Sequence, residues 1–182
     1  MVSVPLIPSE TDPKLVVGFQ GNSWAAYRPD SGTYALYGSD PGHLTWFVPP
    51  ESTPGRGFWA RFPSGDTTFP QGAFPSQDQP AAIHLLPGWN IIGNPYLSAA
   101  TWNLDAITVQ VAGNTPKSLR NSRDVVAGYA WGWRPNEANP YTGAYYLVWD
   151  PLLKPGVANR LEPWQAFWIK ARLECNLILP PP

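Results

Sequence analysis

The sequence is poor in cysteine and in charge. Among its 182 residues Cys175 is the only cysteine, so neither a disulfide within the chain nor a cysteine-rich metal site can form. Charged residues make up 14%, with 12 basic residues against 13 acidic ones. Proteins that neutralise phosphates carry a basic excess, so nucleic acid is not an expected partner.

Long hydrophobic runs are also lacking. No apolar stretch approaches the ~20 residues that a membrane-spanning helix needs. The succession of charged, apolar and small residues typical of a signal peptide does not open the chain. We therefore expect no membrane span, and an export signal, if the protein is exported, would lie outside this sequence.

Enzyme signatures are missing as well. The only histidines, His43 and His84, lie in unrelated contexts, and no metalloprotease, nucleophile-elbow, phosphate-loop or dinucleotide motif is found. Glu137, Asp150 and Glu162 could supply the two carboxylates of a glycosidase. However, Asp150 and Glu162 each precede a proline, which is typical of turns. The sequence predicts a protein that is not an enzyme, with a small hydrolase as the weakest alternative.

A cofactor is not predicted either. Asp30, Asp40 and Asp66 lie near glycine or serine in expected loops, but they do not form a calcium-loop pattern. A structural calcium ion held by loop carboxylates is the alternative that the sequence leaves open.

Proline and aromatic residues are abundant. The chain has 23 prolines, 10 tryptophans, 8 tyrosines and 7 phenylalanines. Proline at this density breaks helices and central strands, so we expect short strands joined by ordered turns. The predicted fold is all-β, an antiparallel β-sandwich or a pair of small barrels built from two pseudo-repeated halves.

Four short blocks recur in the same order about 110 residues further along the chain. The first copies are Tyr27-Arg28-Pro29, Gly32–Leu36, Gly57–Arg61 and Thr67–Pro70, and the second copies are Trp133-Arg134-Pro135, Gly143–Leu147, Ala166–Lys170 and Leu177–Pro180. Compositional bias in an aromatic-rich chain is the alternative explanation. We predict an N-terminal arm or linker at 1–13 and one β domain at 14–182, with pseudo-repeats 14–80 and 81–182 that share one core.

The segment Gly88–Tyr96 reads GWNIIGNPY and is followed by SAATWNLDAI. Together with the later aromatic strands Tyr129–Trp133, Tyr145–Trp149 and Glu162–Lys170, it resembles a repeat found in β-rich accessory modules of bacterial secreted and cell-surface multidomain proteins. The resemblance implies a non-catalytic module that is secreted or at the cell surface, next to other domains of the same polypeptide. The first half lacks this block, which leaves either a truncated repeat or a strand from Lys14–Gln20 in its place.

The aromatic residues carry the functional prediction. Flat rings on a rigid sheet suit the apolar face of a sugar ring, while neighbouring polar side chains can bind its hydroxyls. The predicted ligand is a polysaccharide, and the predicted binding residues are Trp24, Tyr27, Trp46, Trp131, Trp133, Arg134, Tyr146 and Trp149. We expect Phe58, Trp89, Phe167 and Trp168 in the core instead. The alternative is a structural or adhesion module that binds no sugar.

Overall fold

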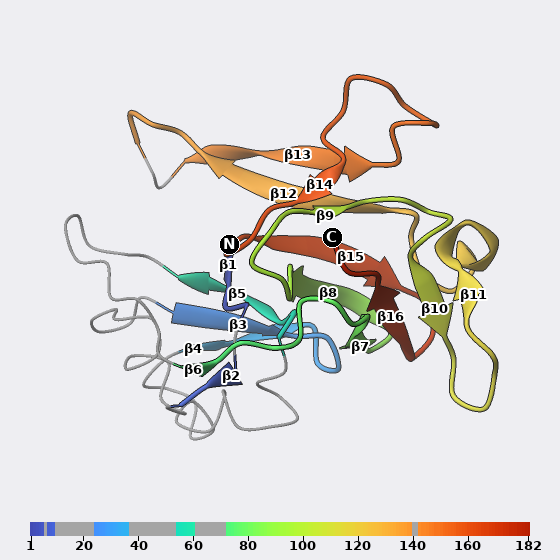
Figure 1. The fold of residues 1–182 in the computed structure, drawn as a ribbon. Helices are drawn as coiled ribbons and strands as arrows, with labels where there is room; N and C mark the ends of the chain where they lie inside the picture. Colours follow the sequence, from blue (N-terminus) through green and yellow to red (C-terminus); the bar gives the residue numbers. More distant parts are fainter. Residues whose placement is uncertain (6, 10–23, 37–53, 61–71, 140–141) are drawn as a thin grey trace.

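The computed structural model describes residues 1–5, 7–9, 24–36, 54–60, 72–139 and 142–182 (Figure 1). These residues form short strands, paired in antiparallel ladders, and one turn of 3-10 helix, η2 (Leu119–Ser122). The prediction of an all-β fold is therefore confirmed. The strand expected at Lys14–Gln20 lies outside the described residues.

Two four-stranded sheets form a sandwich in the second half of the chain. The central sheet has the order β8-β15-β12-β13, and its strands are β8 (Gly88–Gly93), β15 (Ala166–Ala171), β12 (Tyr129–Pro135) and β13 (Gly143–Trp149). The C-terminal sheet has the order β11-β10-β16-β7, and its strands are β11 (Lys117–Ser118), β10 (Thr108–Gln110), β16 (Cys175–Leu179) and β7 (Ala81–Leu85). Each sheet places alternate side chains toward the other sheet.

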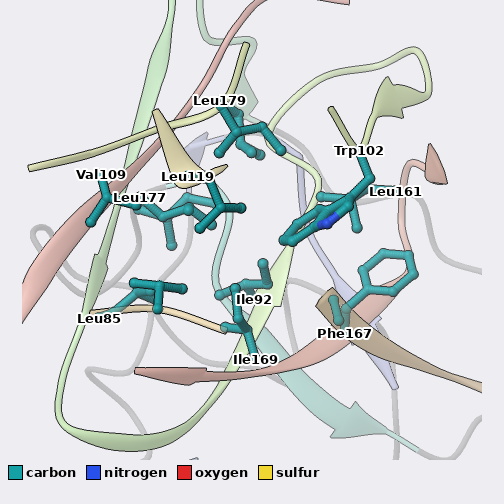
Figure 2. Close-up of a cluster of buried hydrophobic side chains, with 14 of the residues drawn as sticks. Leu85, Ile92, Trp102, Val109, Leu119, Leu161, Phe167, Ile169, Leu177 and Leu179 are labelled. Atoms are coloured by element: carbon teal, nitrogen blue, oxygen red, sulfur yellow. The ribbon is translucent and has the colours of Figure 1, made fainter. Parts of the chain in front are cut away.

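The main core lies between these two sheets. Figure 2 shows Ile92, Phe167 and Ile169 of the central sheet gathered with Val109 and other side chains of the C-terminal sheet. The segment between β8 and β10 adds its own large side chains to this core. Among them Trp102 is fully buried and its indole N–H donates a hydrogen bond to the Gly128 carbonyl at 3.0 Å, which satisfies the polar atom of the ring.

The N-terminal sheet has the order β1-β5-β3-β4. Its strands are β1 (Val2–Ser3), β5 (Gly57–Ala60), β3 (Trp24–Arg28) and β4 (Thr33–Leu36). In Figure 1 this sheet and the strands β10 and β16 of the C-terminal sheet lie on either side of β8. Two further ladders are two-stranded, β14 (Arg160–Leu161) with β9 (Ala100–Thr101) and β2 (Ile7–Pro8) with β6 (Gly72–Ala73).

The start of the predicted N-terminal arm belongs to the N-terminal sheet. Because β1 pairs with β5, Ser3 and Val4 are buried. The strand position beside β5, for which the sequence offered Lys14–Gln20, is occupied by β1. The arm prediction therefore differs from the structure at residues 2–4, where pairing and burial hold the chain against the domain.

The N-terminal and central sheets share strand order and register. Three of the four blocks of the predicted repeat lie in β3, β4 and β5, and their second copies lie in β12, β13 and β15 in the same strand order, with β1 in the position of β8. The fourth block, Thr67–Pro70, lies outside the described residues. In the N-terminal sheet Ala25 pairs with Trp59, Tyr27 with Tyr34, and Val2 with Phe58. The equivalent pairs of the central sheet are, in the same order, Trp131 with Trp168, Trp133 with Tyr145, and Ile92 with Phe167.

Two backbone hydrogen bonds join these two sheets in corresponding ways. The Ser3 N–H donates to the Trp164 carbonyl at 3.0 Å, and the Gly93 N–H donates to the Gly55 carbonyl at 2.7 Å. Both acceptors have positive φ, 64° at Trp164 and 103° at Gly55. A tryptophan rarely adopts this conformation, and Trp164 is the only residue other than glycine to do so in the described part of the chain.

The single core expected for both halves is not what the described residues form. The main cluster of buried side chains draws only on residues between Ala81 and Leu179. Phe58 of the N-terminal sheet is buried outside that cluster. The reason is that the central sheet presents its small and aliphatic face to the C-terminal sheet and a different, aromatic face to the N-terminal sheet.

We predict that Gly93→Ala destabilises the contact between the N-terminal and central sheets. A Cβ at residue 93 would lie 2.0 Å from the Ser3 Cβ and 3.3 Å from the Arg56 carbonyl, so the sheets must move apart at a cost of about 1–3 kcal/mol. Urea unfolding would measure the loss. Ser3→Gly removes the Ser3 Cβ, with which the new Cβ at residue 93 would clash. The double variant Ser3→Gly with Gly93→Ala should therefore lose less free energy of unfolding than the sum of the losses in the two single variants. Additive losses would contradict this explanation.

A second prediction concerns Cys175, which is buried in β16. Burial, with a smaller contribution from Glu174, raises the pKa of its thiol to about 11. Near pH 8 the thiol is therefore protonated, and reaction with a disulfide reagent should be at least about a hundredfold slower than for an exposed cysteine. Labelling should become fast in guanidinium chloride, and rapid labelling of the folded protein would contradict the burial.

Candidate functional site

Strand β12 separates large side chains from small ones. Tyr129, Trp131 and Trp133 point to one face of the central sheet, whereas Ala130 and Gly132 are buried on the other. This follows from the two-residue period of a strand. The aromatic face is therefore encoded by every second residue of β12.

The register extends the aromatic face across the central sheet. Trp131 pairs with Trp168 of β15, and Tyr129 pairs with Trp149 of β13. In the next ladder Lys170 pairs with Trp89, so a positive charge lies among the rings. Antiparallel pairing places directly opposite side chains on the same face, which makes these residues neighbours.

Rings of the N-terminal sheet meet this face. The centroids of Tyr27 and Trp168 are 4.8 Å apart at an interplanar angle of 77°. Trp59 and Trp133 are 5.7 Å apart at 71°. Both pairs have the edge-to-face geometry that aromatic rings favour.

An aromatic groove lies where the two sheets meet. Its lining consists of the rings of Tyr27, Trp89, Trp131, Tyr145 and Trp168, and its volume is about 430 Å³. This volume is within the range of ordinary small-ligand pockets, roughly 300–1,000 Å³. Because the lining rings come from both halves of the chain, the groove exists only when the halves are docked.

Several of these rings are accessible. Trp89 keeps 36% of its surface exposed and Tyr145 keeps 51%. Trp168 is 6.3 Å from Trp89, at an interplanar angle of 83°, and also contacts Tyr27. The Lys170 ammonium lies 5.7 Å from the centre of the Trp89 ring, in the range of a cation–π contact.

Tyr34 lies at the same junction. Burial raises the pKa of its hydroxyl, a hydrogen bond with the Trp59 side chain opposes this shift, and the nearby Tyr145 and Tyr27 hydroxyls add to it. Tyr34 therefore stays neutral at physiological pH.

A basic pocket lies beside Tyr129, next to the aromatic face. It is lined by Arg123, Lys170 and Arg172, by the rings of Tyr129 and Trp149, and by the backbone of residues 127–128, with a volume of about 550 Å³. The two rings are stacked, 5.4 Å apart at 29°. The Trp149 indole N–H is the one buried side-chain nitrogen or oxygen without a hydrogen-bond partner in the described part of the chain.

The structure brings some predicted binding residues together. Tyr27 and Trp131 line the groove, and Trp133 contacts Trp59 and Tyr145 beside it. Trp149 lies in the basic pocket. Trp24 is in β3, but its side chain is not described, and Trp46 lies outside the described residues.

Arg134 and Tyr146 lie apart from the groove. Tyr146 faces the opposite side of β13, where its ring covers Gly132, and burial raises the pKa of its hydroxyl. Its hydroxyl hydrogen-bonds to the Gln165 side chain at 3.0 Å, and the Arg134 guanidinium is 5.2 Å from its ring centre. These residues line a third, polar pocket together with Glu162.

Three groove residues were not among the predicted binding residues. Trp89 and Trp168 were expected in the core, and for Trp89 that prediction is wrong because its ring is exposed. Tyr145 was not selected at all. A usable signal was present, since Trp168 shares its strand face with the exposed Lys170 and not with the buried Phe167. The core predictions for Phe58 and Phe167 are confirmed.

The carboxylates considered for a glycosidase have separate surroundings. Asp150 is 1% exposed, and its oxygens accept hydrogen bonds from the backbone N–H groups of Leu104 at 3.1 Å and Leu152 at 2.9 Å. The Leu152 bond confirms a turn at Asp150. Glu162 lines the polar pocket, and Glu137 is exposed.

In the ranges that the structure describes, no three His, Cys, Asp or Glu side chains are grouped to hold a metal ion. The suggested structural calcium therefore stays untested. Within the same ranges no helix has the length and apolar character to cross a membrane.

Comparisons with protein-family models, with curated proteins and with solved structures found no match to this chain. The resemblance based on GWNIIGNPY therefore stays a prediction.

Proposed function

We propose that this protein binds a polysaccharide in the aromatic groove and carries out no chemistry on it. The observation that carries the proposal is the convergence of five tyrosine and tryptophan rings on one groove at the surface. A structural role for these rings would bury them, whereas Trp89 and Tyr145 are exposed. Exposed rings held by a rigid sheet are poised to contact a ligand.

The composition of the groove suits a sugar. A pyranose has an apolar face of C–H groups that packs on a flat ring, and hydroxyls around its edge that need polar partners. The rings of Trp89, Trp131 and Trp168 offer such faces. Lys170 pairs with Trp89 and Tyr145 lines the same groove, so an ammonium and a hydroxyl are polar groups beside these rings.

The predicted duplication bears on how the groove is built. We infer that residues 14–80 and 81–182 are two copies of one β unit, because three of the four blocks that recur in the sequence occupy corresponding strands in the same register. In this proposal the groove is the junction between the two copies. Polysaccharides are long repeating ligands, which suits an open groove better than a closed cavity.

The setting of the module is part of the proposal. The resemblance of Gly88–Tyr96 to a repeat of bacterial surface proteins favours a secreted or cell-surface protein whose other domains lie next to this one. The alternative is a structural or adhesion module with no sugar ligand. Exposed apolar side chains outside the groove favour it, notably Leu152 at 78% and Phe74 at 61% exposure.

We expect Trp89→Ala to weaken polysaccharide binding at least tenfold, or about 1.4 kcal/mol, because it removes an exposed stacking surface of the groove. Trp164→Ala is the matched control, since Trp164 has nearly the same exposure, 37% against 36%, but does not line the groove. Tryptophan fluorescence titrated with soluble glycans, with pull-down on cellulose, xylan and chitin, would measure both variants.

Two results would count against the proposal. One is the absence of any response to every glycan by the wild-type protein, which would favour the structural alternative. The other is equal weakening by both variants, which would place binding outside the groove. Thermal unfolding of each variant would separate a loss of binding from a loss of folding.

A further inference from the structure

We propose that the polysaccharide is anionic, and that its carboxylate or sulfate groups bind in the basic pocket while its sugar rings occupy the aromatic groove. This inference rests on the proposed function and names the class of its ligand. The chain as a whole has a formal charge of −1. Nevertheless, three cations line one pocket, and no acidic side chain is in the lining of that pocket.

The three cations are available for a ligand. Arg123, Lys170 and Arg172 are exposed, and none of them is within ion-pair distance of a carboxylate among the described residues. The two nearest acids in the sequence do not neutralise them. Asp124 is exposed and does not line the pocket, and Glu174 lies 3.5 Å from His84.

The pocket is held by the backbone. The segment before β12 runs antiparallel to the end of β15, with a bridge between Val126 and Ala171. The Arg172 N–H donates to the Val125 carbonyl at 2.7 Å, and the Ala127 N–H donates to the Lys170 carbonyl at 2.8 Å. These bonds hold the backbone of Lys170 and Arg172 against residues 125–127, so less order has to be created when an anion binds.

The basic pocket and the aromatic groove are continuous. Lys170 lines the pocket and lies over Trp89, which lines the groove. Tyr129 lines the pocket and is 6.1 Å from Trp131, which lines the groove. One chain of sugars could therefore stack in the groove and continue past Tyr129 to the cations.

The chemistry of the cations favours an oxyanion. A guanidinium presents parallel N–H groups that match the two oxygens of a carboxylate, and it binds sulfate in the same way. Arg123 and Arg172 supply two such groups, and Lys170 adds a point charge near the rings. A neutral glycan would leave all three charges without partners.

The test compares matched glycans on the whole chain. Polygalacturonate and its methyl-esterified form share a backbone and differ in charge, and dextran sulfate against dextran provides the same comparison for sulfate. The variants are Arg123→Gln with Arg172→Gln in one chain, and Trp131→Ala in another. Lys117→Gln with Lys154→Gln is the control of equal charge loss, because both lysines are exposed and line neither site.

The expected result is at least tenfold tighter binding of a charged glycan than of its neutral partner at low salt. The arginine variant should remove this preference, the lysine control should keep it, and added salt should reduce it. Trp131→Ala should weaken charged and neutral glycans alike. Preference for polygalacturonate or for dextran sulfate would identify the anionic group.

Other results overturn the inference in distinguishable ways. Equal binding of charged and neutral forms, unchanged in the arginine variant, refutes the anionic ligand and leaves the proposed function standing. Binding that depends on the arginines but not on Trp131 refutes the groove and with it the proposed function. Tighter binding of an oligothymidylate than of any acidic glycan would assign the pocket to nucleic acid.

Discussion

The central sheet is apolar on both faces, and the arrangement of the molecule follows from this. Its small and aliphatic face, with Ala130, Phe167 and Ile169, is covered by the C-terminal sheet. Its other face carries tyrosine and tryptophan rings, and Trp89 and Tyr145 among them remain exposed. The N-terminal sheet covers part of that face, and the part left uncovered is the aromatic groove.

Small residues determine how closely the two halves dock. A Cβ at Gly57 would lie 2.5 Å from the Ala166 Cβ, and one at Gly93 would lie 2.0 Å from the Ser3 Cβ. In the strand register Gly57 corresponds to Ala166 and Ser3 to Gly93, so corresponding positions touch each other. The same docking places the ring centroids of Tyr27 and Trp168 4.8 Å apart.

Much of the groove could be foreseen from local pattern. The alternation of Tyr129, Trp131 and Trp133 with Ala130 and Gly132 predicts a strand with one aromatic face, because side chains alternate along any strand. The recurrence of Tyr27-Arg28-Pro29 as Trp133-Arg134-Pro135 predicts corresponding strands. The same pattern could not show that Trp131 lines the groove and Arg134 does not. Alternation places the two residues on opposite faces of the strand, but it does not say which face is covered by another sheet.

The amino-acid order alone determines the strand composition, the all-β class and the contrast between the two faces of β12, because these are local properties. Which residues line the groove is not a local property of the sequence. Trp89 and Trp168 line the groove because β8, at the edge of the central sheet, pairs with β15 and the rings of both strands point toward a half that covers them incompletely. Likewise Arg123, Lys170 and Arg172 are brought together only by the bridge between Val126 and Ala171. Exposure and proximity depend on which strands pair and on what covers each face, and these are decided by tertiary packing.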